Sequence, residues 1–363
     1  MGVSETVRQR LAQQRLTGVP LRTPVEVVAW LGAVQSQEYK EAKWSLGLRM
    51  MAGIDAAVEQ AYNAGEILRT HVMRPTWHFV TPAALGWLLE LTAGRVIAGM
   101  ASRHRQLELD AGQIQRSNDA IARSLEGGRA LTRSELAAAL EAAGISTEGQ
   151  RLPHLLMRAE LDGVICSGPR QGKQVTYALI AERAPHARRL SRDEALVELV
   201  RRYFTGHGPA RVRDFTWWSG LTVADAKAGL GAAGAELARA EIDGEVHYYA
   251  ADLMDAPDPE ETAFLLPTFD ELLVGYAGFD KSRSGGHALD LSAHFQARVL
   301  IGGRVAASWR RTFKKDVVQI EIVPFAPLSS AEEAALEAAG ARYARFGGRE
   351  AQITLRKSAL AGQ

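Results

Sequence analysis

The sequence of 363 residues contains a single cysteine, Cys166, which excludes an internal disulfide framework and suits a reducing compartment. Its nine histidines show no short paired spacing, so a zinc site built from Cys and His is not expected. No apolar run approaches the length of a bilayer span, and no signal-peptide apolar block follows the polar N-terminal segment. We therefore expect a cytoplasmic protein without a metal, a cofactor or a membrane partner.

A strong excess of charge is also missing. The 43 basic and 42 acidic residues give a net charge of +1, so the overall charge does not mark a nucleic-acid-binding protein. Residues 206–260 carry 4 basic and 10 acidic groups, which leaves the remainder of the chain basic. A DNA-binding surface would therefore be a local patch outside this acidic block.

A capped helix leads directly into a short polar motif. Thr23 and Glu26 form a capping-box pattern, and apolar residues at helical spacing predict a helix over residues 24–34. Gln35 and Gln37 follow, two positions apart, which places them on one face of an extended segment but not of a helix. If both amides serve one site, the chain must leave the helix here. The residue types alone leave open the alternative that the motif is a solvated helix end.

The clearest supersecondary unit covers residues 131–190. A capped helix beginning near Thr132 and a second helix over 147–162 precede two short strands that flank a basic loop with Arg170 and Lys173. This order of helix, turn, helix, strand, basic loop and strand is typical of a winged helix-turn-helix.

Similar orders of elements precede and follow this unit. From residue 263 onward, the predicted elements are mainly short strands. We predict an α+β fold with tandem winged-helix (helix-turn-helix) units and a C-terminal small β-barrel, partly open or a curled sheet, with one helix over residues 329–345. The predicted regions are 1–130 with the Gln-Ser-Gln motif, 131–190 and 191–255 as the second and third winged helices, and 263–363 as the barrel-like domain.

A predicted hairpin in the C-terminal domain interleaves cations with aromatic rings. Arg310, Arg311 and Lys314 stand beside Trp309 and Phe313. This composition suits phosphate contact and base stacking. A charged strand edge that blocks aggregation has the same composition, so both interpretations remain open.

Two other motifs suggest chemistry that their context does not support. Gly229 to Gly234 match G-x-G-x-x-G, but a predicted helix rather than a strand precedes them, so a nucleotide cofactor is not expected. Asp270, Glu271 and Asp280 form a carboxylate cluster of the kind that glycosidases use. The favoured interpretation is that these carboxylates form salt bridges with basic neighbours.

Five segments stand in the order of a known family. They are Ala33–Glu38, Ser45–Arg49, Arg74–His78, Asp214–Leu221 and Leu265–Glu271. Together they resemble the winged-helix DNA glycosylases of the AlkZ and YcaQ type, over nearly the whole chain. The resemblance implies three tandem winged helices around a DNA channel, a C-terminal β-barrel, and removal of alkylated purines from double-stranded DNA.

The resemblance assigns the catalytic roles to Gln35 and Gln37, while Ser36 departs from the mostly aliphatic middle position of the family signature. Because an alkylated purine already carries positive charge, it leaves without a strong general acid. Two amides can orient a water against the anomeric carbon and share the oxocarbenium-like charge. No lysine is evidently placed for a Schiff base, so we expect a monofunctional hydrolase. We also expect the protein to act as a monomer, with interstrand crosslinks as further candidate substrates.

The remaining candidate residues are contacts to DNA, and they are Arg49, Arg74, Trp77, His78, Arg170, Lys173, Arg310, Arg311 and Lys314. For Trp77 a place in the core remains an alternative, and His78 should then face the opposite way. The alternative function is a non-catalytic winged-helix DNA-binding protein or regulator, although one winged helix and a ligand domain would be typical of that class. A glycosidase that uses the Asp270 cluster ranks third.

Overall fold

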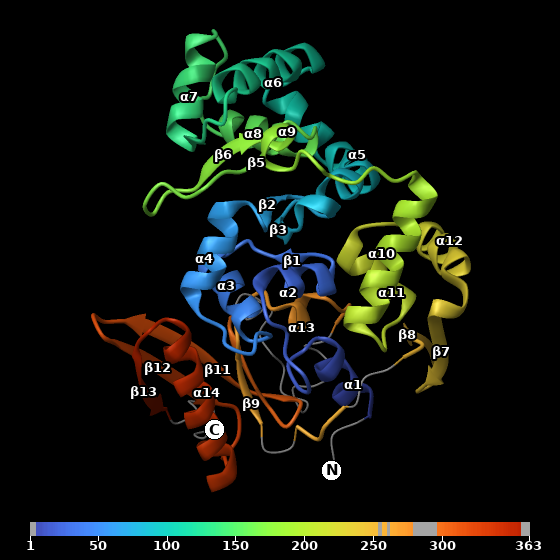
Figure 1. The fold of residues 1–363 in the computed structure, drawn as a ribbon, viewed down its shortest axis with the longest axis vertical. Coiled ribbons are helices and arrows are strands. Elements are labelled where there is room, and N and C mark those ends of the chain that lie inside the picture. Colours follow the sequence, from blue (N-terminus) through green and yellow to red (C-terminus); the bar gives the residue numbers. More distant parts are fainter. Residues whose placement is uncertain (1–4, 253–255, 260–261, 279–295, 357–363) are drawn as a thin grey trace. The chain divides into compact units, whose positions relative to one another are not determined.

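The computed structural model describes residues 5–252, 256–259, 262–278 and 296–356. The chain divides into two compact units, coloured along the sequence in Figure 1. The first unit combines residues 1–59, 201–218 and 233–363, and the second combines residues 60–200 and 219–232. The division into four regions stays a prediction.

The N-terminal helices of the first unit begin and end as local sequence dictates. The hydroxyl of Thr23 accepts the N–H of Glu26 at 3.1 Å, and Pro24 occupies the first helical position. Gly32, with φ +83°, ends this helix, because an L side chain rarely adopts that conformation. The elements are α1 (Glu5–Gln13), α2 (Pro24–Leu31), β1 (Val34–Gln35), α3 (Tyr39–Gly47) and the start of α4 (Asp55–Ala64).

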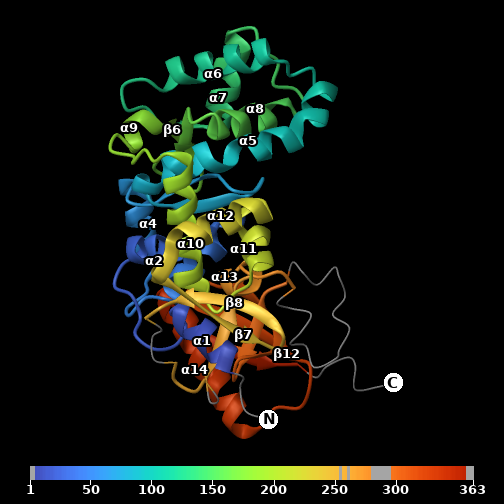
Figure 2. The same ribbon diagram turned by 90° about the vertical axis from the view of Figure 1, so that its right-hand side faces the viewer.

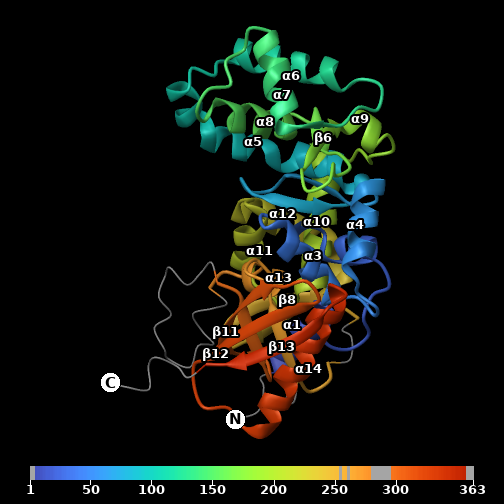
Figure 3. The same cartoon turned by 90° about the vertical axis from the view of Figure 1, so that its left-hand side faces the viewer.

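A five-stranded sheet in the order β13-β12-β11-β10-β9 forms most of the C-terminal part of the first unit. Neighbouring strands are antiparallel, except that β12 and β13 are parallel. Helix α14 packs against β9 and β13, and Figure 3 shows it beside β13. The sheet of described strands is open at β9 and β13, so the predicted barrel is not confirmed. The bounds are β9 (Ala263–Leu266), β10 (Arg298–Ile301), β11 (Arg304–Phe313), β12 (Val317–Pro324), α14 (Ser330–Phe346) and β13 (Glu350–Leu355).

The segment predicted as a third winged helix contains three helices followed by a two-stranded hairpin. The hairpin turns at Asp243-Gly244, where both residues have positive φ. Figure 2 shows its two strands side by side. The elements are α10 (Arg192–His207), α11 (Val212–Ser219), α12 (Val223–Ala233), η1 (Gly234–Glu236), β7 (Leu237–Ile242) and β8 (Glu245–Ala250).

The second unit contains a helical group with its own core. Leu125, Leu136, Leu140, Ala159 and Ile165 are fully buried together, under a three-stranded sheet in the order β4-β6-β5. Thr132 and Glu135 form the complete capping box predicted at the start of α7. The elements are β2 (Leu68–His71), β3 (Trp77–Val80), α5 (Pro82–Gln106), α6 (Ala111–Leu125), β4 (Leu131–Thr132), α7 (Arg133–Ala142), α8 (Arg151–Leu161), β5 (Ile165–Ser167), β6 (Thr176–Leu179) and α9 (Ile180–Arg183).

Helix α5 has 25 residues and is mostly apolar, whereas the sequence analysis expected no apolar run of bilayer-spanning length. By length and composition alone it is the one described helix that could cross a membrane. Within its most apolar 18-residue window, 56% is buried inside the protein. Ala93, Val96 and Met100 pack with Leu161 of α8 in a small core cluster, which is how a helix of a folded core behaves.

Candidate active site and DNA-contact residues

The Gln-Ser-Gln motif lies on an extended segment between two helices. Helix α2 ends at Leu31, Gln35 belongs to β1, and α3 begins at Tyr39. The prediction that the chain leaves the helix before the two glutamines is confirmed, and the solvated-helix-end alternative is wrong. Gln35 is 6% exposed, Ser36 is fully buried and Gln37 is half-buried.

A buried carboxylate fixes the backbone of this segment. Glu271 Oε1 accepts the backbone N–H of Gln35 at 2.6 Å, and its Oε2 accepts the indole N–H of Trp218 at 3.0 Å. Nε2 of His207 lies 3.5 Å from the same Oε2. Glu271 is fully buried at the first position of α13 (Glu271–Val274), so this contact holds the first glutamine against a short, anchored helix.

Sequence analysis did not foresee that Glu271 positions the motif. The signal was present, because the segments that contain Trp218 and Glu271 are two of the five that carry the family resemblance. Residue types alone could not pair a carboxylate with a backbone N–H 236 residues away.

Asp270 forms the salt bridge that the sequence favoured. Its two oxygens accept Nη1 and Nη2 of Arg49, each at 2.8 Å, and the Ser45 hydroxyl donates to Oδ2 at 2.7 Å. Burial raises the pKa of Asp270, but the Arg49 charge and these hydrogen bonds outweigh burial and lower the pKa overall. Asp270 and Glu271 are both fully buried, so neither is placed for glycosidase chemistry, and Asp280 lies outside the described residues.

The position of Arg49 corrects its predicted role. Its side chain is fully buried and bidentate to Asp270, so no surface is left for the predicted phosphate contact. Its Nη2 also donates to Gln14 Oε1 at 2.8 Å, and the Gln14 amide donates to the Tyr276 hydroxyl at 3.2 Å. Tyr276 in turn donates to the carbonyl of His207 at 2.8 Å. The hydrogen-bond network therefore runs from Arg49 to His207, which lies beside Glu271.

The three candidates around the β2–β3 hairpin differ in exposure. Arg74 and Trp77 are half-buried, whereas His78 is fully buried, which is against its predicted contact with DNA. Burial and the Arg74 charge hold the pKa of His78 well below its usual value. Trp77 donates its indole N–H to Glu160 at 3.2 Å and lies under the Arg69 guanidinium, 4.4 Å from the ring centroid. The half-buried Trp77 does not occupy the core place given as its alternative, and its contact with DNA stays a prediction.

The loop between β5 and β6 presents its cations to the surface. Lys173 is exposed and Arg170 is half-buried. The backbone N–H of Arg170 donates to Asn63 at 2.8 Å, and its guanidinium donates to the carbonyl of Lys173. The loop is therefore braced from both ends while Lys173 stays available to solvent.

The cations of the β11–β12 hairpin have different environments. Arg310 is exposed and pairs with Glu321 at 2.5 Å, and Lys314 is exposed at the turn. Arg311 is less exposed and pairs with Glu41 at 2.9 Å. Burial opposes ionisation of Glu41, yet the Arg311 charge and the Thr268 backbone N–H lower its pKa overall.

Among the described residues, no three His, Cys, Asp or Glu side chains form a group that could hold a metal ion. The absence of a metal or cofactor stays a prediction.

Comparison with known proteins identifies the family. A family model described as DNA glycosylase AlkZ-like matches residues 28–346. The chain belongs to the AlkZ-like DNA glycosylase family. A relative from Streptomyces sahachiroi, named interstrand DNA cross-link repair glycosylase, is 27% identical over 346 residues, which cover 89% of this chain and 90% of that protein. The solved structure of Streptomyces sahachiroi DNA glycosylase AlkZ has a TM-score of 0.80 at 22% identity and covers 98% of this chain and 100% of its own.

Family membership confirms the resemblance and the enzyme class. This AlkZ-like chain is a DNA glycosylase, a hydrolase of N-glycosyl bonds, and its substrate is DNA. The fold is a mixed α and β fold similar to that of the solved AlkZ structure.

Proposed function

We propose that this AlkZ-like protein hydrolyses the N-glycosidic bond of alkylated purines in double-stranded DNA, with one water positioned by Gln35 and Gln37. The observation that carries this assignment is the extended Gln-Ser-Gln segment, whose first backbone N–H is held at 2.6 Å by the buried carboxylate of Glu271. Holding a reacting group and a water in one geometry removes an entropic barrier from the chemical step.

Neutral amides suit this reaction. An alkylated purine leaves as a neutral base once the bond breaks, so its departure needs no strong acid. The amide oxygens of Gln35 and Gln37 accept hydrogen bonds from the attacking water and face developing positive charge on the sugar. The product is an abasic site, and no second, lyase step follows.

Winged helices supply the DNA contacts in this proposal. Helices α6, α7 and α8 with strands β4, β5 and β6 follow the order of a winged helix, and the β5–β6 loop corresponds to the wing. Lys173 on this loop and Arg310 and Lys314 on the β11–β12 hairpin are exposed cations suited to phosphates. The enzyme acts as a monomer, and the C-terminal sheet acts as the barrel-like domain.

Interstrand crosslinks are a further proposed substrate. The Streptomyces sahachiroi relative is named for cross-link repair. A crosslinked purine is alkylated at the ring and carries the same good leaving group, so the same two glutamines would release it from one strand.

The experiment that tests the proposal replaces each glutamine separately. Gln35→Ala and Gln37→Ala should each lower the single-turnover rate of base excision about a hundredfold, since losing one positioned group commonly has that effect. Excision is measured on duplexes with different alkylated purines, as alkali-sensitive abasic sites. Gln37→Ala should keep the free energy of unfolding within about 1 kcal/mol of the parent, whereas Gln35→Ala should lower it by about 1–3 kcal/mol because the Gln35 side chain is buried.

Gln60→Ala serves as the matched control, since it removes an exposed glutamine from α4. Two variants that melt normally and excise at the parent rate would refute the assignment. Two variants that unfold would make the glutamines structural.

A further inference from the structure

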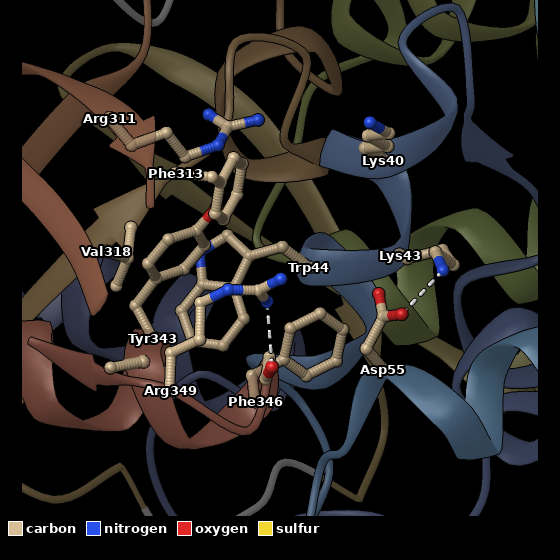
Figure 4. Close-up of a pocket in the computed structure, with 12 residues that line it drawn as sticks. Lys40, Lys43, Trp44, Asp55, Arg311, Phe313, Val318, Tyr343, Phe346 and Arg349 are labelled. Carbon is tan, nitrogen blue, oxygen red and sulfur yellow. Dashed lines mark hydrogen bonds and ion pairs between the residues drawn. The ribbon is translucent and has the colours of Figure 1, made fainter. Parts of the chain in front are cut away.

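A small pocket with aromatic walls and a cationic rim lies within the first unit, apart from the Gln-Ser-Gln segment. Its volume is about 290 Å³, at the lower end of ligand pockets, so it suits one planar group with its charge rather than a longer ligand. Figure 4 shows Trp44, Phe313 and Tyr343 turned toward one another, with guanidinium groups among them. Helices α3 and α14 and strands β11 and β12 contribute the lining.

The aromatic floor of this pocket is rigid. Trp44 donates its indole N–H to the carbonyl of Leu265 at 2.7 Å, and its ring contacts Tyr343 and Phe346 at centroid distances of 4.9 and 5.2 Å. Burial raises the pKa of Tyr343 to about 12, so the phenol is neutral at physiological pH. The floor is therefore an uncharged aromatic surface that is formed in advance.

Phe313 differs from the floor because 48% of it is exposed. The Arg349 guanidinium lies 5.1 Å from its ring centroid, and the Arg311 guanidinium lies 5.9 Å away. An exposed phenyl ring at the end of a strand, flanked by two guanidinium groups, forms a platform for a planar group.

The charge at the rim favours an anion. Arg311 is neutralised by Glu41, and Lys43 by Asp55 and Glu59. Among the described residues, no carboxylate lies within ion-pairing distance of Arg349 or Lys40, although both line the pocket. Two cations thus remain for a ligand, beside an aromatic platform.

We propose that this pocket is an accessory site for one nucleotide of single-stranded DNA, with the base stacked on Phe313 and the phosphodiester held by Arg349 and Lys40. An aromatic platform beside a phosphate-binding cation is how proteins hold single strands without reading sequence. The site is separate from the glutamine pair, so it can fail without affecting the proposed excision. It would hold an unpaired nucleotide near a lesion, where the duplex is opened.

The test measures binding of a fluorescent hexathymidylate to the full-length protein by anisotropy. Phe313→Leu keeps an apolar side chain but removes the ring, and should weaken binding about tenfold, as expected when one base stack is lost. Phe313→Tyr should restore binding to within about twofold, because stacking tolerates the hydroxyl. Arg349→Met should weaken binding and flatten its salt dependence by about 0.7 per phosphate on a single strand.

Arg345→Met is the matched control, since it removes an exposed arginine of α14 that does not line the pocket. Thymidine monophosphate should compete with the oligonucleotide, whereas inorganic phosphate at equal concentration should not. Three outcomes would each overturn the proposal: parent-like binding by Phe313→Leu, equal loss in the Arg345 and Arg349 variants, or equal competition by phosphate.

Discussion

Arg49 and Asp270 are both fully buried, and the charge of each is compensated by the other. Bidentate geometry and the Ser45 hydroxyl satisfy the carboxylate, so its desolvation is offset by direct contacts. Asp270 also accepts the N–H of Leu272 at 2.9 Å as the N-cap of α13, the helix that carries Glu271. Arg49, predicted to contact DNA, and Asp270, predicted to form a salt bridge, therefore together anchor the helix beside the Gln-Ser-Gln segment.

Asp270→Asn should lower the free energy of unfolding by about 3 kcal/mol at pH 7, because breaking a buried pair leaves the Arg49 charge uncompensated. The difference in unfolding free energy between the parent and Asp270→Asn should shrink only toward acid pH. The pKa of Asp270 is lower in the folded than in the unfolded protein, so its stabilisation is fully present above the unfolded value of about 3.9. It is lost as pH falls through the lower folded pKa.

Urea unfolding of the parent and of Asp270→Asn at several pH values checks this prediction. The gap between them should be constant from pH 8 to about 5 and should narrow below about 4. Asp119→Asn, an exposed aspartate of α6, provides the control and should stay within about 0.5 kcal/mol of the parent. A gap that widens toward acid would contradict the stated direction of the pKa shift.

At the scale of elements, local signals predicted more than long-range ones. Capping residues at Thr23 and Thr132 predicted where two helices begin, and the structure confirms both. Helix α3 was not predicted, because Lys40, Lys43 and Arg49 read as a polar stretch. The burial and pairing of Arg49 depend on Asp270, far along the chain, which no local pattern reveals.

The packing of α3 on α14 gives a prediction that separates close packing from helix propensity. A Cβ at Gly47 would lie 2.5 Å from the Phe346 ring, whereas a Cβ at Gly94 in α5 would meet nothing within 4 Å. Gly47→Ala should lower the free energy of unfolding by about 1–3 kcal/mol through overpacking. Gly94→Ala should raise it by about 0.5–1 kcal/mol, because alanine loses less backbone entropy in a helix.

Chemical denaturation of the two variants beside the parent measures both effects. Because the substitution is the same, helix propensity alone predicts that both variants gain stability. A stabilised Gly47→Ala would show that the Phe346 ring moves aside without loss.

At the scale of the whole molecule, binding to DNA must come from where the charges lie. The net charge of +1 provides little long-range attraction, and residues 206–260 hold 10 acidic groups against 4 basic ones. Sequence composition could predict this asymmetry because charge counts need no geometry. It could not predict which cations are free, since Arg49 and Arg311 proved to be held by Asp270 and Glu41.

The last prediction concerns the salt dependence of binding to duplex DNA. Lys173→Ala and Lys314→Ala each remove an exposed cation, from the β5–β6 loop and the β11–β12 hairpin respectively. Each should flatten the slope of log K against log salt by about 0.9, the value for one lost phosphate contact, and the double variant by about twice that. Binding is titrated at four or more salt concentrations with one undamaged duplex, so that excision does not intervene.

Lys227→Ala is the control for charge alone, because it removes an exposed lysine of α12 within the acidic block. All three single variants change the net charge by the same amount. If long-range attraction governed binding, all three single variants would weaken DNA binding alike, with similar slopes of log K against log salt. A changed slope at Lys173 and Lys314 but not at Lys227 assigns the contacts to the loop and the hairpin, and a parent slope in all three would remove both from the DNA-binding surface.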